Sequence, residues 1–410
     1  MKILDWNLIL RRDNFFLFLQ ILFTGIIVFF SASGLQYPTS VFLALNTIVY
    51  LLFSKSSKEL SLLIKHSWMA KIFLGLVFSM IVSYSNIYQI QLPSVILLQK
   101  ANTINLFVYS LVWFLNFLFV AIYIIRVRTY KMLYYLTIIF FLCALYSNWR
   151  AYNYNRLVLD YIHQLHYYYF VLVCLPILFL CSNKWVKYIL IFIATLATFY
   201  CFKRSGIFVC GIISLFCYLV DTKQSVKSFL IGLIVVVLFY NIFWKYYQEN
   251  EAVIRTIERM EMLSDDGGSG RSDNIVATLQ FIDKSTIEEK LFGHGFMSML
   301  IERRHMVDVE WIAIYYYHGW LGLIFYTLFH FLLIKRLFSI KQIFGNNKIL
   351  SAYIACWTIF AFYSFAGEMF SYQYLSSLLF VFLGMVEGLI VLQKKQYLVV
   401  DNSKKRVAIQ

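Results

Sequence analysis

Two arginines near glycines have the chemistry to recognise a phosphate or pyrophosphate group. Arg271 follows a glycine-rich loop that ends at Gly270, and it precedes a predicted helix over 272–288. Free N–H groups at a helix N-terminus and a guanidinium fork both suit a phosphate anion. Arg204 lies between two apolar segments, where an arginine pairs or faces a wet cavity. The plainer alternatives are a flexible loop before an ordinary helix cap for Arg271, and an arginine that reaches the membrane surface for Arg204.

Two carboxylates further along the chain could position or deprotonate an acceptor hydroxyl. Asp308 and Glu310 stand at the start of an apolar segment, two residues apart, and therefore point to different faces of a helix. We expect Asp308 to cap that helix and Glu310 to face the protein interior. Because a carboxylate at membrane depth is costly, it is a functional candidate. The same reasoning applies to Glu368 and, in an earlier polar loop, to Asp160, His163 and His166.

A turn between Arg271 and these carboxylates supplies a candidate base and backbone donors. The turn spans Leu291 to Gly295, and its glycines, Gly293 and Gly295, allow the backbone to approach a ligand closely. His294 between them is a candidate general base, although a structural hydrogen-bonding role is the more common alternative. Three further candidate ligands for an anion follow in a basic cluster: Arg303, Arg304 and His305.

These residues lie in the only long polar stretch of an otherwise apolar chain, from Tyr247 to Gly322. Thirteen of the 21 acidic residues fall between Glu249 and Glu310. The whole chain of 410 residues is 61% hydrophobic and only 14% charged, too apolar to fold around one aqueous core. Long apolar segments recur along it, as in helical proteins that cross a membrane several times. The composition therefore predicts an all-α integral membrane protein.

We count about twelve spans, at roughly twenty apolar residues per crossing. The whole chain, 1–410, is expected to form one polytopic membrane domain, with a large loop over 247–308. Two amphipathic stripes in that loop, around Val253–Met260 and Ile275–Ile282, predict short helices that lie on the outer membrane surface or pack on the bundle. The expected spans are 14–33, 37–54, 68–86, 104–125, 132–148, 167–183, 187–202, 205–220, 228–246, 309–334, 349–370 and 373–393.

The distribution of lysine and arginine predicts which ends of the spans face the cytoplasm. Alternate loops and both termini hold 23 of the 36 basic residues, so both termini are expected to be cytoplasmic and the large loop extracytoplasmic. The net charge of +15 is explained by this bias, and we expect no nucleic-acid partner. The seven cysteines fall in or beside the spans without metal-ligand spacing, and we expect them to act as small apolar residues. No cofactor and no metal ion are expected.

Several short motifs together resemble the O-antigen polymerase and ligase family of bacterial envelope glycosyltransferases. The resemblance covers roughly 199–322 and rests on Gly270-Arg271 followed by a helix and Leu291-Phe-Gly-His-Gly295. It extends to Asp308-Val-Glu310-Trp311 and Gly319-Trp-Leu-Gly322. Arg204 stands where the family often has an arginine after a short span. Family ligases typically have a His-Asn pair where this chain has Asp308-Val309, which favours the polymerase branch.

The resemblance implies a polymerase of O-antigen or capsule in the bacterial cytoplasmic (inner) membrane. Such an enzyme transfers the growing glycan from undecaprenyl pyrophosphate to the next lipid-linked repeat unit on the outer face. Arg204 and Arg271 would neutralise the leaving pyrophosphate, and Glu310 or Asp308, with His294 or His305 in reserve, would activate the acceptor. The implied partners are the undecaprenyl-pyrophosphate-linked oligosaccharide, membrane lipid, a chain-length regulator and a flippase.

Three other functions remain open from the sequence. A ligase would move finished polymer onto lipid A core or another acceptor. A flippase for lipid-linked oligosaccharide would carry polar residues along many spans and two similar halves, whereas this chain concentrates its polar residues in loops and shows no internal repeat. A structural partner of an envelope-synthesis complex would tolerate loss of Arg204 and Arg271 individually.

Overall fold

The computed structural model describes most of the helical core of the chain. The described residues are 12–30, 35–54, 56–87, 103–158, 168–181, 183–201, 204–222, 271–295, 309–344, 347–366 and 373–407. Within these ranges every regular element is a helix. The predicted span 228–246 and the stripe around Val253–Met260 lie outside them.

In chain order the described helices are α2 (Arg12–Phe29), α3 (Gln36–Phe53), α4 (Ser57–His66), α5 (Trp68–Ile87), α6 (Thr103–Ser110), α7 (Val112–Val127), α8 (Lys131–Val158), α9 (Tyr168–Leu172), α10 (Leu175–Leu178), α11 (Lys184–Tyr200), α12 (Arg204–Thr222), α15 (Arg271–Asp283), α16 (Ile287–Phe292), α18 (Glu310–Phe344), α19 (Asn347–Ala366) and α20 (Gln373–Val407).

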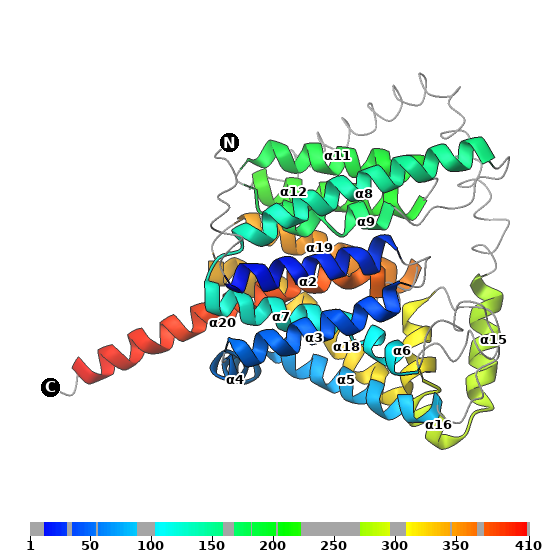
Figure 1. Ribbon diagram of the computed structural model, residues 1–410, viewed down its shortest axis with the longest axis horizontal. Helices are drawn as coiled ribbons and strands as arrows, with labels where there is room; N and C mark the ends of the chain where they lie inside the picture. The colour runs from blue at the N-terminus through cyan, green and yellow to red at the C-terminus, as the bar shows by residue number, and fades with distance from the viewer. Residues whose placement is uncertain are drawn as a thin grey trace.

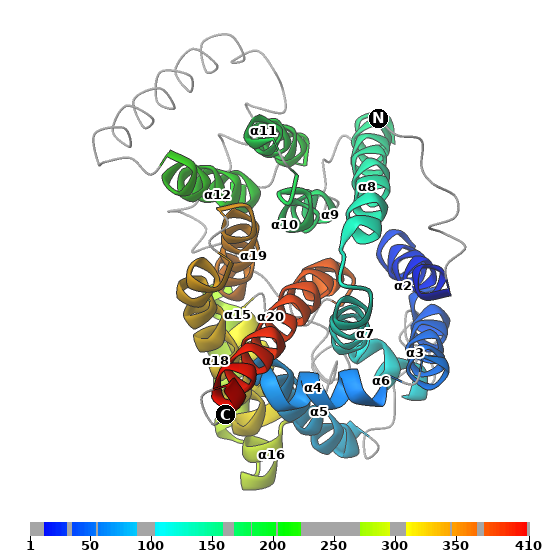
Figure 2. The same ribbon diagram turned by 90° about the vertical axis from the view of Figure 1, so that its left-hand side faces the viewer.

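Helix α20 forms the centre of the bundle and packs along α7 (Figures 1 and 2). Two glycines one turn apart make this contact close. A β-carbon on Gly384 would lie 2.4 Å from the carbonyl oxygen of Phe117, and one on Gly388 would lie 2.8 Å from that of Ala121. Small residues at this spacing allow membrane helices to pack backbone to backbone. This Gly-x-x-x-Gly motif is visible in the sequence but was not predicted as a helix contact.

Six of the described helices are long and apolar enough to cross a membrane. Helices α4 and α5 together would make a seventh, although they meet at an angle of 96°. These helices agree with an all-α membrane protein. Four shorter apolar helices, Val112–Val127, Tyr169–Leu178, Trp185–Thr198 and Ser205–Val220, occupy predicted spans without reaching that length.

Basic side chains tie several helices together at one end of the bundle. Arg126 in α7 donates from Nη1 to the carbonyl oxygen of Ser54 after α3 (2.7 Å) and from Nε to Asp13 in α2 (3.1 Å). Lys394 in α20 donates to the carbonyl oxygen of His66 at the end of α4 (3.1 Å). Helix α20 leaves the bundle at this end, whereas α15 and α16 lie at the opposite end (Figure 1).

Several predicted elements differ from the structure, some because helix breaks leave hydropathy unchanged and others because a helix continues past its apolar run. The predicted span 104–125 is divided between α6 and α7, and α8 continues beyond the predicted span 132–148 to Val158. The predicted helix 272–288 ends at Asp283, and a new helix begins after Thr286. The predicted span 309–334 starts as expected, but it continues to Phe344 and is broken at Gly319. The span 167–183 consists of two short helices, α9 and α10, and α20 continues beyond 393.

Candidate functional site

Helix α15 lies across the end of the bundle, roughly perpendicular to the other helices (Figure 1). Its inner face packs on α18 through Ile282, which is buried with Tyr316 and Tyr317. Val276 and Leu279 are instead exposed, so the predicted apolar stripe divides between a packed face and an outer face. A helix in this position agrees with the expectation of a surface helix in the large loop.

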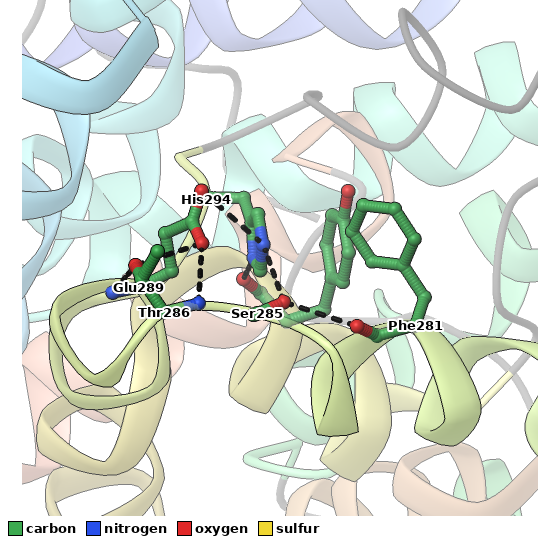
Figure 3. Close-up of polar contacts among 6 residues, drawn as sticks. Phe281, Ser285, Thr286, Glu289 and His294 are labelled. Atoms are coloured by element: carbon green, nitrogen blue, oxygen red, sulfur yellow. Dashed lines mark hydrogen bonds and ion pairs between the residues drawn. The ribbon is translucent and has the colours of Figure 1, made fainter.

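The short helix α16 starts with a capping box formed by Thr286 and Glu289. The Glu289 backbone N–H donates to Thr286 Oγ1 (3.2 Å), and the Thr286 backbone N–H donates to Glu289 Oε2 (2.8 Å) (Figure 3). The Thr286 backbone N–H, and secondarily its hydroxyl and the charge of His294, lowers the pKa of the Glu289 carboxyl from 4.5 against a smaller effect of burial. This box explains why the predicted helix 272–288 is interrupted, since its two reciprocal bonds satisfy the start of a new helix.

The turn after α16 closes the end of the first segment of α18. The backbone N–H groups of His294 and Gly295 donate to the carbonyl oxygens of Tyr316 and Tyr317, both at 2.9 Å. Both carbonyls lie just before the break in α18 at Gly319. Gly293 (φ 83°, ψ 174°) and Gly319 (φ 61°, ψ −163°) have backbone angles accessible almost only to glycine. The turn and the break therefore form one unit.

The break at Gly319 folds the two segments of α18 toward each other. In a straight helix, Trp311 and Tyr326 would be about 22 Å apart. Their ring centroids are 4.9 Å apart, and Trp311 also lies 5.0 Å from the His330 ring. The bend brings the start of α18, including Glu310, next to a deeper part of the same helix.

His294 is buried inside this unit and has partners on both ring nitrogens. Its Nδ1 lies 3.2 Å from the carbonyl oxygen of Tyr316, and its Nε2 lies 3.1 Å from the Ser285 hydroxyl. A carbonyl can only accept, so Nδ1 carries a proton. The ring stacks on Tyr316 at 4.4 Å and its Nε2 is 4.0 Å from Glu289 (Figure 3). These contacts fit a histidine that joins the turn to α18, the alternative stated above.

Glu310 is fully buried in the first turn of α18, as expected for the carboxylate that faces the interior. Its charge acts on the phenol of Tyr326, which donates to Ser364 Oγ (3.2 Å). The same serine oxygen lies 3.1 Å from His330 Nε2. Among the described residues, Trp311 Nε1–H in this cluster has no hydrogen-bond acceptor. Glu310 thus stands at the edge of a buried polar and aromatic cluster.

The structure places the two candidate arginines at helix starts. Arg271 is the first residue of α15, and Arg204 is the first residue of α12. Only their backbones are described, so their side chains stay candidate pyrophosphate ligands. Five other candidates, Gly270, Arg303, Arg304, His305 and Asp308, lie outside the described residues, as do Asp160, His163, His166 and Glu368.

Several buried polar groups were not predicted, among them His318, Arg336 and Glu387. His318 lies beside the break, and its Nδ1 is 2.9 Å from the Ser83 hydroxyl in α5. Arg336 was assigned to a cytoplasmic loop but is buried in α18, where it forms a bidentate ion pair with Glu387 in α20. The burial of Glu387 could have been predicted, because this carboxylate lies in the middle of an apolar run.

Within the described part of the chain, no three His, Cys, Asp or Glu residues gather as a metal site. The chain matches no protein-family model, and no curated protein is significantly similar to it in sequence.

Proposed function

We propose that this protein is a membrane glycosyltransferase that polymerises oligosaccharide repeat units carried on undecaprenyl pyrophosphate. The observation that carries the proposal is the fully buried Glu310. The bend in α18 at Gly319 positions the helix segment that begins with Glu310. Helix α15, which begins at Arg271, lies across the same end of the bundle (Figure 1). A carboxylate that accepts a proton and a helix start that binds an anion are the two groups that this reaction would use.

In the proposed reaction, an acceptor sugar hydroxyl attacks the anomeric carbon of the donor glycan. A new carbon–oxygen bond forms while the bond from that carbon to the pyrophosphate oxygen breaks. Glu310 takes the hydroxyl proton, and undecaprenyl pyrophosphate leaves with the bonding electron pair. Arg271 and Arg204, at the starts of α15 and α12, would stabilise the negative charge on the leaving group.

The location that we propose is the bacterial cytoplasmic membrane, with twelve spans, both termini in the cytoplasm and the site on the outer face. The apolar helices support a membrane location. The positive charges at the end of the bundle opposite α15 support this orientation. Chain-length regulators and flippases of the same system would be its partners.

A gel ladder of surface polysaccharide tests the proposal. We expect a deletion strain to attach a single repeat unit to its acceptor, and wild-type protein to restore the ladder. Arg271→Ala and Glu310→Gln should insert normally but leave the single unit. Lys284→Ala, which removes an exposed positive charge beyond the other end of α15, is the matched control and should restore the ladder. A full ladder from well-expressed Arg271→Ala or Glu310→Gln would refute these roles, and unattached long polymer in the deletion strain would indicate a ligase.

A second candidate, a flippase for lipid-linked oligosaccharide, is favoured by a buried polar network between α2, α3 and α7. Gln20 donates to Asn116 (2.9 Å), and Asn46 donates to Gln20 (2.8 Å). This network departs from the expectation that polar residues concentrate in loops. Most of the polar groups in this network hydrogen-bond to one another. They therefore favour a role in helix packing over a role in a transport path, which would leave polar groups available to the substrate. Reconstituted protein that moves lipid-linked sugar across vesicles without elongating it would favour the flippase.

A further inference from the structure

The corner between α4 and α5, at the end of the bundle opposite α15, has the geometry of a membrane-surface element. The two helices meet at 96°, so α4 runs along the membrane plane if α5 crosses it. Ser67 makes the corner: its N–H donates to the Leu63 carbonyl oxygen at the end of α4 (2.8 Å), and its Oγ accepts from the Ala70 N–H (3.0 Å). One residue therefore closes α4 and caps α5.

Positive charges gather at this corner. Lys65 precedes His66 in the last turn of α4, Lys71 lies near the start of α5, and Lys394 comes from α20. Burial first, and then the charges of these three lysines, lower the pKa of His66. Lys394 is anchored by its hydrogen bond to the His66 carbonyl oxygen. Like charges repel one another, so a set of three from separate elements favours a bound anion nearby.

The acid at this corner is already neutralised. Glu387 accepts two hydrogen bonds from Arg336, at 2.7 and 2.9 Å, and a third from the Ser67 hydroxyl at 2.6 Å. A bidentate arginine pair uses the carboxylate fully. Burial first, and then the Arg336 charge, lower the pKa of Lys394, and the Glu387 charge opposes them. Among the described residues, Lys65, Lys71 and Lys394 form no ion pair with a carboxylate, and the other acid of this corner, Glu59, lies in the first turn of α4.

Exposed apolar groups place the lysines at the level of lipid headgroups. Trp68 is 62% exposed at the first position of α5, and the Lys71 ammonium lies 4.6 Å from its ring centroid. Ile64 on α4 is also exposed. Tryptophan prefers the boundary between headgroups and acyl chains, and lysine reaches from there toward phosphate.

We propose that the α4–α5 corner binds the phosphate of an anionic phospholipid, with Lys65, Lys71 and Lys394 as its cationic partners. Trp68 and Ile64 contact the glycerol and upper acyl region of that lipid. A free phosphate ion would match the charge but would leave these two apolar side chains in water. The lipid would fix the angle between α4 and α5, and with it the position of α20 through Lys394. This proposal is independent of the reaction proposed above.

Lipid titration of the full-length protein in neutral detergent tests this site. The ligands are phosphatidylglycerol, phosphatidylcholine and inorganic phosphate. Binding is followed by quenching of tryptophan fluorescence with lipids brominated on their acyl chains, comparing wild type with Trp68→Phe. The lysine variants are Lys65→Gln, Lys71→Gln and Lys394→Gln. Matched controls are Lys131→Gln and Lys341→Gln, which remove an exposed lysine on α8 or α18 outside the corner.

We expect phosphatidylglycerol to quench Trp68 with saturation and phosphatidylcholine to quench it much more weakly. Each corner variant should bind phosphatidylglycerol about fivefold more weakly, since a lysine near an anionic surface contributes about 1 kcal/mol. High salt should weaken binding, and the control variants should match wild type. The proposal would be overturned if both lipids bound with equal affinity, or if the control variants weakened binding as much as the corner variants. It would also be overturned if inorganic phosphate, at the same concentration as the lipid, prevented the quenching of Trp68. Unchanged thermal midpoints without lipid would show that a corner variant is folded.

Discussion

Gly319 in α18 lies directly against Gly293 in the turn after α16: a β-carbon added to Gly319 would lie 2.6 Å from the backbone nitrogen of Gly293. Conversely, a β-carbon on Gly293 would lie 2.3 Å from the carbonyl oxygen of Tyr317. The turn after α16 is thus pressed directly against the break in α18. This contact fixes where the first segment of α18 points, and Glu310 is at the start of that segment.

Replacing either glycine with alanine should destabilise the protein. Gly293→Ala and Gly319→Ala each force a β-carbon into backbone atoms and into angles that cost about 1–3 kcal/mol. We expect lower thermal midpoints in detergent and loss of the polysaccharide ladder. The control is Gly211→Ala in α12, where no atom lies within 4 Å of the new β-carbon; it should raise stability by about 0.5–1 kcal/mol. A wild-type midpoint for Gly319→Ala would contradict the contact.

His294 offers a separate test of structure against catalysis. Its ring bonds to Tyr316 and Ser285, so His294→Ala should cost about 1–3 kcal/mol by leaving buried groups unpaired. His294→Asn keeps an amide donor near the position of Nδ1, for the Tyr316 carbonyl oxygen. If His294 only joins the turn to α18, His294→Asn should restore the polysaccharide ladder at normal expression. A stable His294→Asn protein that gives only the single repeat unit would instead assign the proton transfer to His294.

The capping box predicts a pH-dependent contribution to stability. The pKa of Glu289 is lowered below 4.5 in the folded protein, so its contribution is present above pH 4.5 and is lost as the pH falls through the folded value. Because of this lowered pKa, the difference in thermal midpoint between wild type and Glu289→Gln should shrink as the pH is lowered from 6 to 3. The other half of the capping box is tested by Thr286→Ala, which should cost about 1 kcal/mol of stability at pH 7. Glu288→Gln, on the exposed side of α16, is the control. A difference that grows toward acid pH would refute the assignment.

The sequence predicted the class of the fold and the position of Glu310 but not the bend that presents it. Apolar composition determines a helical membrane protein because backbone groups have no other partners in lipid. Burial of Glu310 followed from its place at the start of an apolar run. The break at Gly319 leaves no trace in hydropathy, since both segments of α18 are apolar. Gly319 and the turn around Gly293 were both singled out as sequence motifs, yet their contact depends on tertiary packing.

The charged residues show the same limit. Counting lysines and arginines placed Arg336 at the basic end, and Arg126 and Lys394 do meet helix ends there. The count could not separate a solvated arginine from a buried one, because the difference lies in whether a carboxylate faces it. Glu387 lies 51 residues away in another helix. Only helix packing brings the two together.

The Arg336–Glu387 pair should be a strong determinant of stability, because both partners are buried and the contact is bidentate. Removing one partner leaves a buried charge, so Glu387→Gln or Arg336→Gln should each cost about 3–5 kcal/mol. The double variant should cost much less than the sum of the two. Helical content during titration from mild detergent into dodecyl sulfate measures these differences. Arg126→Gln removes a half-exposed pair with Asp13 and should cost at most about 1 kcal/mol. Additive losses in the double variant would mean that packing at each position, and not the ion pair, holds α18 against α20.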